Sequence, residues 1–232
     1  LQAAFDVGPA TVGAIVSLVW FGTALPRLPL SYILTRVSRR RIVVASGVML
    51  TASAALTASS PDIQTLRIGV LAVGVASGTY FVSAVPLIGE LYPDRVGKRI
   101  GIHGTAAQLA AVAAPTIVVS VVAVTTWQTV FWLLAAAAFF TTLAFAFGLR
   151  ETDQIPESPP ARNFRGVLRN WRVVLAGMLF ISAAGFVWQG LFNFYVSVML
   201  ARGLDTGTAN ALLTVTFAAG IPAFWASGAL VD

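Results

Sequence analysis

The chain has no cysteine, a single histidine and few charged residues. The lack of cysteine excludes disulfides, thiolate metal sites and dithiol redox motifs. One histidine is too few for a histidine-rich metal site or a histidine-based catalytic centre, so we expect no metal and no cofactor. Only 10% of the 232 residues are charged, against roughly 25% in a soluble domain, and 57% are apolar. This composition excludes a soluble globular domain, a disordered chain and a coiled coil.

Long stretches without Asp, Glu, Lys or Arg recur along the chain. A helix needs about 20 mainly apolar residues to cross the hydrocarbon core of a bilayer. The stretches lack the alternating pattern of an outer-membrane β-barrel. We therefore expect an all-α membrane protein, a polytopic helical bundle. The sequence predicts seven transmembrane helices, over residues 10–34, 42–60, 66–89, 100–123, 129–149, 173–198 and 207–231.

Most of the basic residues gather in alternate loops, which are residues 35–41, 95–99 and 150–172. The positive-inside rule places such loops in the cytoplasm. We therefore expect the first residue outside and the last inside a plasma membrane of prokaryotic type. Because the basic residues lie between hydrophobic stretches and form no single face, the expected partners are the lipid bilayer and a small solute, and not a nucleic acid.

The first and last predicted helices resemble each other in hydropathy and in proline placement. Residues 11–35 align with residues 208–232 at a constant offset, so that Thr11 meets Thr208 and Ser31 meets Gly228. A polar, proline-rich linker over 151–160 lies between the two copies, and a short interfacial helix is expected over 163–172. Two related halves joined by a cytoplasmic linker are a known plan of transporters. The sequence thus predicts a first half over 1–150, a linker over 151–172 and the start of a second half over 173–232.

Residues 27–41, RLPLSYILTRVSRRR, resemble the signature that the major facilitator superfamily carries between its second and third helices. The signature has two glycines, an aspartate and three arginines, and both glycines and the aspartate are replaced here. Gly228 and Asp232 begin a second copy. Residues 88–104, IGELYPDRVGKRIGIHG, also look like the loop of the family between helices four and five. The first copy of the signature is carried by Ser31, Thr35, Arg36, Ser38, Arg39 and Arg40.

The resemblance implies a secondary transporter of small solutes that works by alternating access. It also implies that the chain covers helices two to eight, with helix one and helices nine to twelve outside it. The signature is expected to form charge contacts at a cytoplasmic gate, for which Glu90 and Asp94 are the candidate acids. The other interpretation of the arginines is that they set only the membrane topology.

Arg27 is unusual because it lies well inside the first predicted helix, between Pro26 and Pro29. A charge at that depth is expected to face a cavity and to have a partner. One interpretation is that Arg27 binds an anionic solute in a central cavity. The alternatives are that it extends along the helix to the lipid headgroups, or that it donates to carbonyl groups freed by the prolines.

Several polar or amphipathic side chains lie deep in the predicted helices, where such groups line a pathway or bridge two helices. We take them as candidates for a substrate cavity. No Asp or Glu lies within a predicted span, so the chain shows no proton site of its own and the coupling ion is unknown. His103 lies close to a helix end and is expected to be structural. The cavity candidates, besides Arg27, are Gln108, Trp188, Gln189, Asn193 and Tyr195.

Two other classes of membrane protein fit the sequence less well. A seven-helix receptor fits the number of spans, but a retinal protein needs a lysine in its last helix, and the only lysine is Lys98 in a loop. A receptor also gives no reason for the repeat. A membrane-embedded enzyme needs clustered His, Asp or Glu in the spans, and these are missing. We therefore expect a transporter and not an enzyme.

Overall fold

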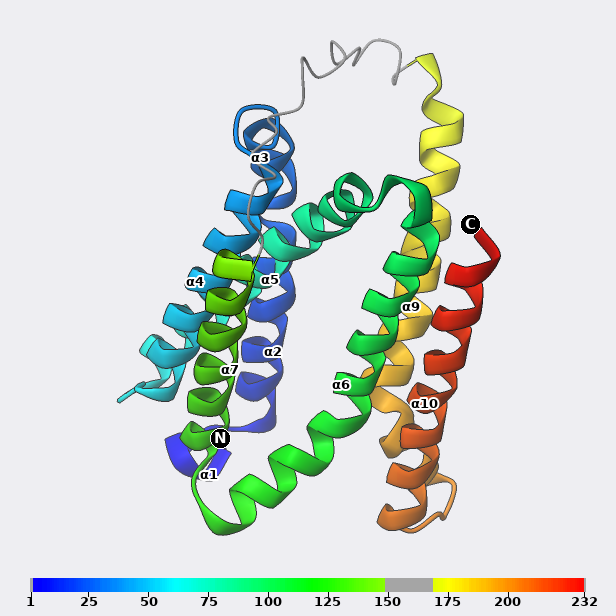
Figure 1. The fold of residues 1–232 in the computed structure, drawn as a ribbon. Coiled ribbons are helices and arrows are strands. Elements are labelled where there is room, and N and C mark those ends of the chain that lie inside the picture. The colour runs from blue at the N-terminus through cyan, green and yellow to red at the C-terminus, as the bar shows by residue number, and fades with distance from the viewer. Residues whose placement is uncertain (1, 149–168, 232) are drawn as a thin grey trace.

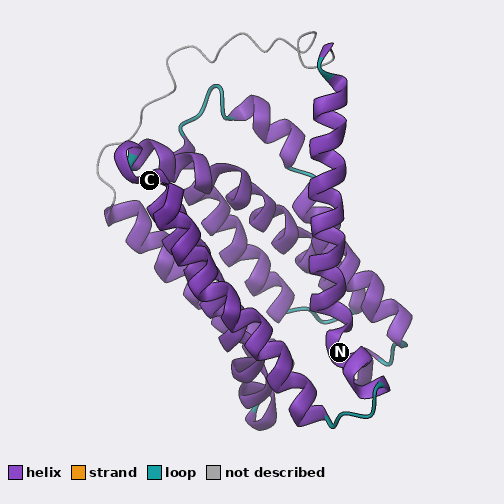
Figure 2. Ribbon diagram, turned by 90° about the vertical axis from the view of Figure 1, so that its right-hand side faces the viewer, coloured by secondary structure: helices purple, strands orange, loops and turns teal. Residues whose placement is uncertain are grey.

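The computed structural model describes residues 2–148 and 169–231. Within these ranges the chain is helical and has no strand, and seven segments are long and apolar enough to cross a membrane. Figures 1 and 2 show the long helices running between two common ends. The helices are α1 (Gln2–Phe5), α2 (Pro9–Ala24), α3 (Arg27–Ile33), α4 (Arg39–Ala58), α5 (Ile63–Leu91), η1 (Pro93–Arg95), α6 (Val96–Val124), α7 (Trp127–Gly148), α9 (Trp171–Ala201) and α10 (Thr206–Val231).

The seven predicted spans are confirmed as helices, with two differences in their bounds. The first span is interrupted after Ala24 and resumes at Arg27, where Pro26 and Pro29 remove backbone N–H donors. The helices α5 and α6 extend beyond the uncharged stretches, since charged residues near a helix end can reach the headgroups. The predicted linker over 151–160 and most of the short helix predicted over 163–172 lie outside the described residues.

The helices before residue 149 form one packed group, apart from α6. Helix α5 packs against both α2 and α4, and α4 also packs against α7. Helix α6 makes few contacts with α5 and α7 and packs along α10 instead. Helix α9 packs on α10, so α6, α9 and α10 form a second group on the other side of Figure 1.

Small residues bring α2 and α5 together. A Cβ atom on Gly74 would lie 3.1 Å from the Cα atom of Gly22, which leaves no room for a side chain between the two backbones. Such close approach gives van der Waals contact in a membrane, where no hydrophobic effect holds helices together. Nearer the start of α2, Ile15 is buried against Leu66 and Val70 of α5.

Two aspartates cap helix N-termini at the end of the bundle opposite the arginine-rich loops. The Asp62 carboxylate accepts hydrogen bonds from the backbone N–H groups of Gln64 and Thr65, at 2.8 and 2.9 Å. Asp205 accepts from the backbone N–H of Thr208 at 3.0 Å and from its hydroxyl group at 2.5 Å. For Asp62, hydrogen bonds from Thr65 are the main cause that lowers the pKa of the carboxyl group. For Asp205, the hydroxyl group of Thr208 is the main cause of a lowered pKa.

These caps predict a dependence of stability on acid. A carboxyl group with a lowered pKa in the folded state stabilises the fold above its unfolded pKa, and that contribution is lost as the pH falls through the folded pKa. We expect the melting temperature of the chain in detergent to decrease below about pH 4. The double variant Asp62→Ala, Asp205→Ala should melt lower at pH 7 and lose less on acidification. If the melting temperatures of the two proteins fell by the same amount from pH 7 to pH 3, the caps would not have this role.

Candidate functional site

Helices α6 and α10 touch backbone to backbone at the end of the bundle near the arginine-rich loops, which we call the basic end. A Cβ atom on Gly101 would lie 2.7 Å from the carbonyl oxygen of Phe224 and 3.0 Å from the Cα atom of Gly228. A Cβ atom on Gly228 would lie 2.7 Å from the carbonyl oxygen of Gly97. Since only glycine fits at such a crossing, these residues allow the first part of the chain to contact the second.

The middle of the same helix pair holds a buried amide. Gln108 on α6 is only 6% exposed, and its side chain lies directly against Gly220 of α10. One turn before Gly220, the ring of Phe217 contacts Trp188 of α9 edge to face, with ring centroids 5.7 Å apart. Two of the predicted cavity residues, Gln108 on α6 and Trp188 on α9, therefore both contact α10.

A cavity of about 310 Å³ opens between α6 and α10 beyond this point, toward the end opposite the basic end. Helix α6 contains Pro115, which removes a backbone hydrogen bond and favours a bend. Figure 1 shows α6 running away from α10 toward α7 over its second half. We call this space the α6–α10 cavity, and it is lined by Ala111, Val112, Pro115, Thr116, Val119, Ser120, Asn210, Leu213, Thr214 and Phe217.

The α6–α10 cavity has unused hydrogen-bonding groups. A serine or threonine hydroxyl group in a helix often donates to a backbone carbonyl of the preceding turn. Within the described ranges, the hydroxyl groups of Thr116 and Ser120 make no such bond and donate to no other protein group. The Asn210 amide donates to the Thr206 carbonyl at 2.9 Å, which leaves its Oδ1 atom as an acceptor. Pro115 has no N–H group to donate to the carbonyl of Ala111. The cavity can therefore both donate to and accept from a ligand.

A second cavity, of about 530 Å³, lies between α4, α5 and α7. Although it is larger, most of its hydroxyl groups already have partners in their own helices. Ser46 donates to the carbonyl of Val43, and Ser77 donates to that of Val73. Its walls also come only from helices before residue 149, so a movement of these helices against α9 and α10 would not open or close it.

The basic end holds two contacts made by the arginines of the sequence signature. Arg39 forms an ion pair with Glu90, which joins the start of α4 to the end of α5. The guanidinium group of Arg40 donates to the carbonyl of Ala146 at 2.7 Å, near the end of α7. A cation near a helix C-terminus is favoured by the free carbonyl groups there. These two arginines therefore tie α4 to both of its neighbours.

The other signature residues make local contacts. The Ser31 hydroxyl group donates to the Leu28 carbonyl, and the Thr35 hydroxyl group donates to the Tyr32 carbonyl. The Arg36 guanidinium group lies 4.6 Å from the centre of the Tyr32 ring. Ser38 is buried at the N-terminus of α4. The structure thus brings Arg39 together with Glu90, while Asp94 is exposed in η1.

Of the remaining cavity candidates, Arg27 begins α3, is exposed and lines neither of the two cavities described above. Tyr195 lies on α9 and is half-buried. The side chains of Gln189 and Asn193, and the residue Asp232, lie outside the described residues. Gly228 lies against α6 and not beside the signature arginines.

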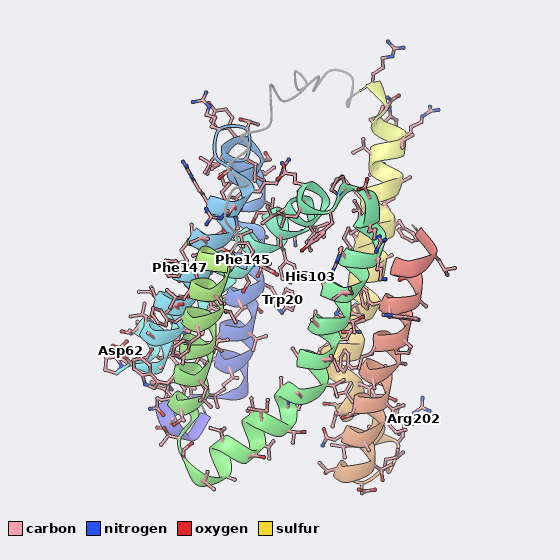
Figure 3. The ribbon with its side chains drawn as sticks, in the orientation of Figure 1. Trp20, Asp62, His103, Phe145, Phe147 and Arg202 are labelled. Atoms are coloured by element: carbon pink, nitrogen blue, oxygen red, sulfur yellow. The ribbon has the colours of Figure 1, made fainter. Side chains whose placement is uncertain are left out.

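His103 lies on α6 and its ring is 5.8 Å from that of Tyr80 on α5. Figure 3 shows His103 and Trp20 in the space between α6 and α2. This ring contact joins α6 to the first group of helices.

Sequence reasoning missed the residues that shape the α6–α10 contact. Gly97 and Gly101 are four residues apart, and this spacing of small residues is typical of close helix pairs in membranes. The spacing could have identified the contact surface of α6, but not its partner. Thr116, Ser120 and Asn210 were missed because isolated hydroxyl and amide groups near helix ends carry no distinct pattern.

The family model described as Major Facilitator Superfamily matches residues 1–232. No curated protein matches the sequence.

Proposed function

Because the chain belongs to the Major Facilitator Superfamily, it is an integral membrane transporter of small molecules and not an enzyme, and we propose that it works as a secondary active carrier by alternating access. This family membership also removes the seven-helix receptor from consideration. One observation supports the proposed mechanism: α6 and α10 are in backbone contact at one end and enclose a cavity toward the other.

A carrier of this kind must expose its binding site to one side of the membrane at a time. The Gly101–Gly228 crossing closes the basic end, because no side chain separates the two backbones there. The bend at Pro115 moves α6 away from α10 at the opposite end, where the cavity lies. We infer that the two halves of the chain, with α6 in the first and α10 in the second, rock against each other, with Gln108 and Gly220 near the middle of the moving contact.

The distribution of basic residues indicates which side of the membrane the closed end faces. Arginine-rich loops stay in the cytoplasm, so we propose that the basic end is cytoplasmic and that the structure is closed to the inside. The contacts of Arg39 and Arg40 support a mechanical role for the signature, since they would let α4, α5 and α7 move as one body. We propose that residues 1–150 supply the first half of the carrier and residues 173–232 belong to the second.

An anionic solute was expected only because of Arg27. That expectation receives no support from the α6–α10 cavity, which Arg27 does not line. Arg27 begins α3 directly after Pro26, near the basic end, and its exposed position supports the alternative in which it reaches the headgroups.

The proposal predicts that the outer ends of α6 and α10 occupy two positions. The chain has no native cysteine, so the pair Ser120→Cys, Asn210→Cys can carry two spin labels without further changes. Pulsed dipolar spectroscopy in lipid nanodiscs should give two distances, the longer one for the arrangement described here. No knowledge of the solute is needed for this measurement.

A matched pair on one helix provides the control. Labels on Thr206→Cys and Asn210→Cys, both in α10, should give one distance under all conditions. If the Ser120 and Asn210 pair also gave a single distance, unchanged when the basic end is forced apart, the alternating-access proposal would be rejected.

A further inference from the structure

We propose that the α6–α10 cavity binds an uncharged polar solute, held by hydroxyl and amide groups and not by an ion pair. This inference rests on the proposed transport function, because it takes the cavity as part of the solute pathway. It replaces the anion suggested by Arg27 with a different class of substrate.

The first argument is the absence of charge from the helices that surround the cavity. Residues 100–124, 173–201 and 206–231 contain no Asp, Glu, Lys or Arg. These ranges include the parts of α6, α9 and α10 that face one another here. A charged solute that leaves water for this space would meet no opposite charge on these three helices, which disfavours its binding there. An uncharged solute avoids that penalty.

The second argument is the arrangement of hydrogen-bonding groups. On the α6 side, the Thr116 and Ser120 hydroxyl groups are free to donate. On the α10 side, Asn210 Oδ1 can accept, and the Thr214 oxygen can also accept because its own hydrogen bond goes to the Asn210 carbonyl. A solute with hydroxyl or amide groups can satisfy both walls at once, because each such group donates and accepts.

The third argument is the closed end of the cavity. Phe217 is buried there against Trp188, and Val112 and Leu213 add apolar surface. The volume of about 310 Å³ is small, near the lower limit of the roughly 300–1,000 Å³ found for small-molecule pockets. The cavity therefore suits a compact solute with polar groups along its sides and an apolar face at one end, as a cyclic polyol or a small sugar has.

The test uses six-carbon polyhydroxy solutes of similar size that differ in charge. Liposomes containing the full chain are incubated with an equimolar mixture of glucose, inositol, gluconate, glucuronate and glucosamine, and the contents are measured by mass spectrometry against liposomes without protein. We expect glucose or inositol to accumulate in excess over all three charged compounds. Thr116→Val, which removes the hydroxyl group and keeps the shape, should lower that uptake about tenfold.

Thr216→Val is the matched control. Thr216 lies on α10 but does not line the cavity, and its hydroxyl group donates to the Leu212 carbonyl. Uptake by this variant should equal that of the unmodified chain. Equal loss in both variants would show a general effect on folding and would overturn the assignment of Thr116 to the solute.

The remaining outcomes separate this inference from the proposed function. Preferred uptake of a charged compound would overturn the uncharged substrate and leave transport intact. Uptake of no compound, with two spin-label distances between Ser120→Cys and Asn210→Cys, would overturn the inference while alternating access stands. Uptake of no compound with a single distance would overturn both.

Discussion

Replacing Gly101 with valine should force the basic end apart and abolish transport. The Cβ atom alone would lie 2.7 Å from the Phe224 carbonyl oxygen, and the two methyl groups of valine need still more room. Both neighbours are backbone atoms, so they cannot move aside as a flexible side chain could. Overpacking of this kind costs about 1–3 kcal/mol, which corresponds to a population change of about 5- to 150-fold toward the state open at the basic end. In the spin-label experiment, Gly101→Val should therefore shift the Ser120 and Asn210 pair to its shorter distance.

Gly185→Val on α9 supplies the control for that variant. A Cβ atom on Gly185 meets no atom within 4 Å in the described residues, although it also replaces a glycine in a membrane helix. Its spin-label distances should match those of the unmodified chain. If Gly101→Val left both the distances and transport unchanged, the glycine crossing would have no part in closing the basic end.

Reversing the charge of Arg39 should destabilise the first group of helices. The Arg39–Glu90 ion pair has side-chain exposures of 23% and 31%, so it lies between a surface pair and a buried one. Exposed pairs contribute up to about 1 kcal/mol, and breaking a buried pair costs about 3–5 kcal/mol. We expect Arg39→Glu to cost roughly 2 kcal/mol, because two carboxylates would then face each other. Thermal unfolding in detergent should show a lower melting temperature.

The swapped pair Arg39→Glu, Glu90→Arg tests whether the interaction itself matters. It should recover most of the lost stability, since the attraction is restored with its ends exchanged. Arg95→Glu is the control, because Arg95 is exposed at the same end and undergoes the same change of charge. A similar loss of stability for Arg95→Glu would mean that the total charge of the basic end, and not the ion pair, determines the result.

The spans could be predicted from the sequence because the bilayer imposes a length and a composition on every crossing helix. The break between α2 and α3 was not predicted, although Pro26 and Pro29 mark it. Both prolines were expected to free carbonyl groups within the span, but a division of the span into two helices was not expected. A bend of α6 at Pro115 was also not predicted, and this bend creates the space for the α6–α10 cavity.

The candidate site was predicted less well than the fold. Gln108 and Trp188 were predicted to line a cavity; both lie at the α6–α10 contact or beside it, and neither lines the α6–α10 cavity. Their partners could not be found, because helix pairing depends on shape and distant parts of the chain, which hydropathy does not record. Arg27 attracted attention as a charge deep inside a predicted span, yet it begins a separate helix after Pro26.

The pairing of α6 with α10 has a consequence for how the protein is made. Helix α6 leaves the ribosome well before α10, which follows only after α7, residues 149–170 and α9 have been synthesised. At roughly 5–20 residues per second, several seconds pass before the partner helix arrives. During that time Gln108 and the surface formed by Gly97 and Gly101 face lipid or the insertion machinery. Membrane insertases that hold polar helices are therefore expected to retain α6 until the second half of the protein is inserted.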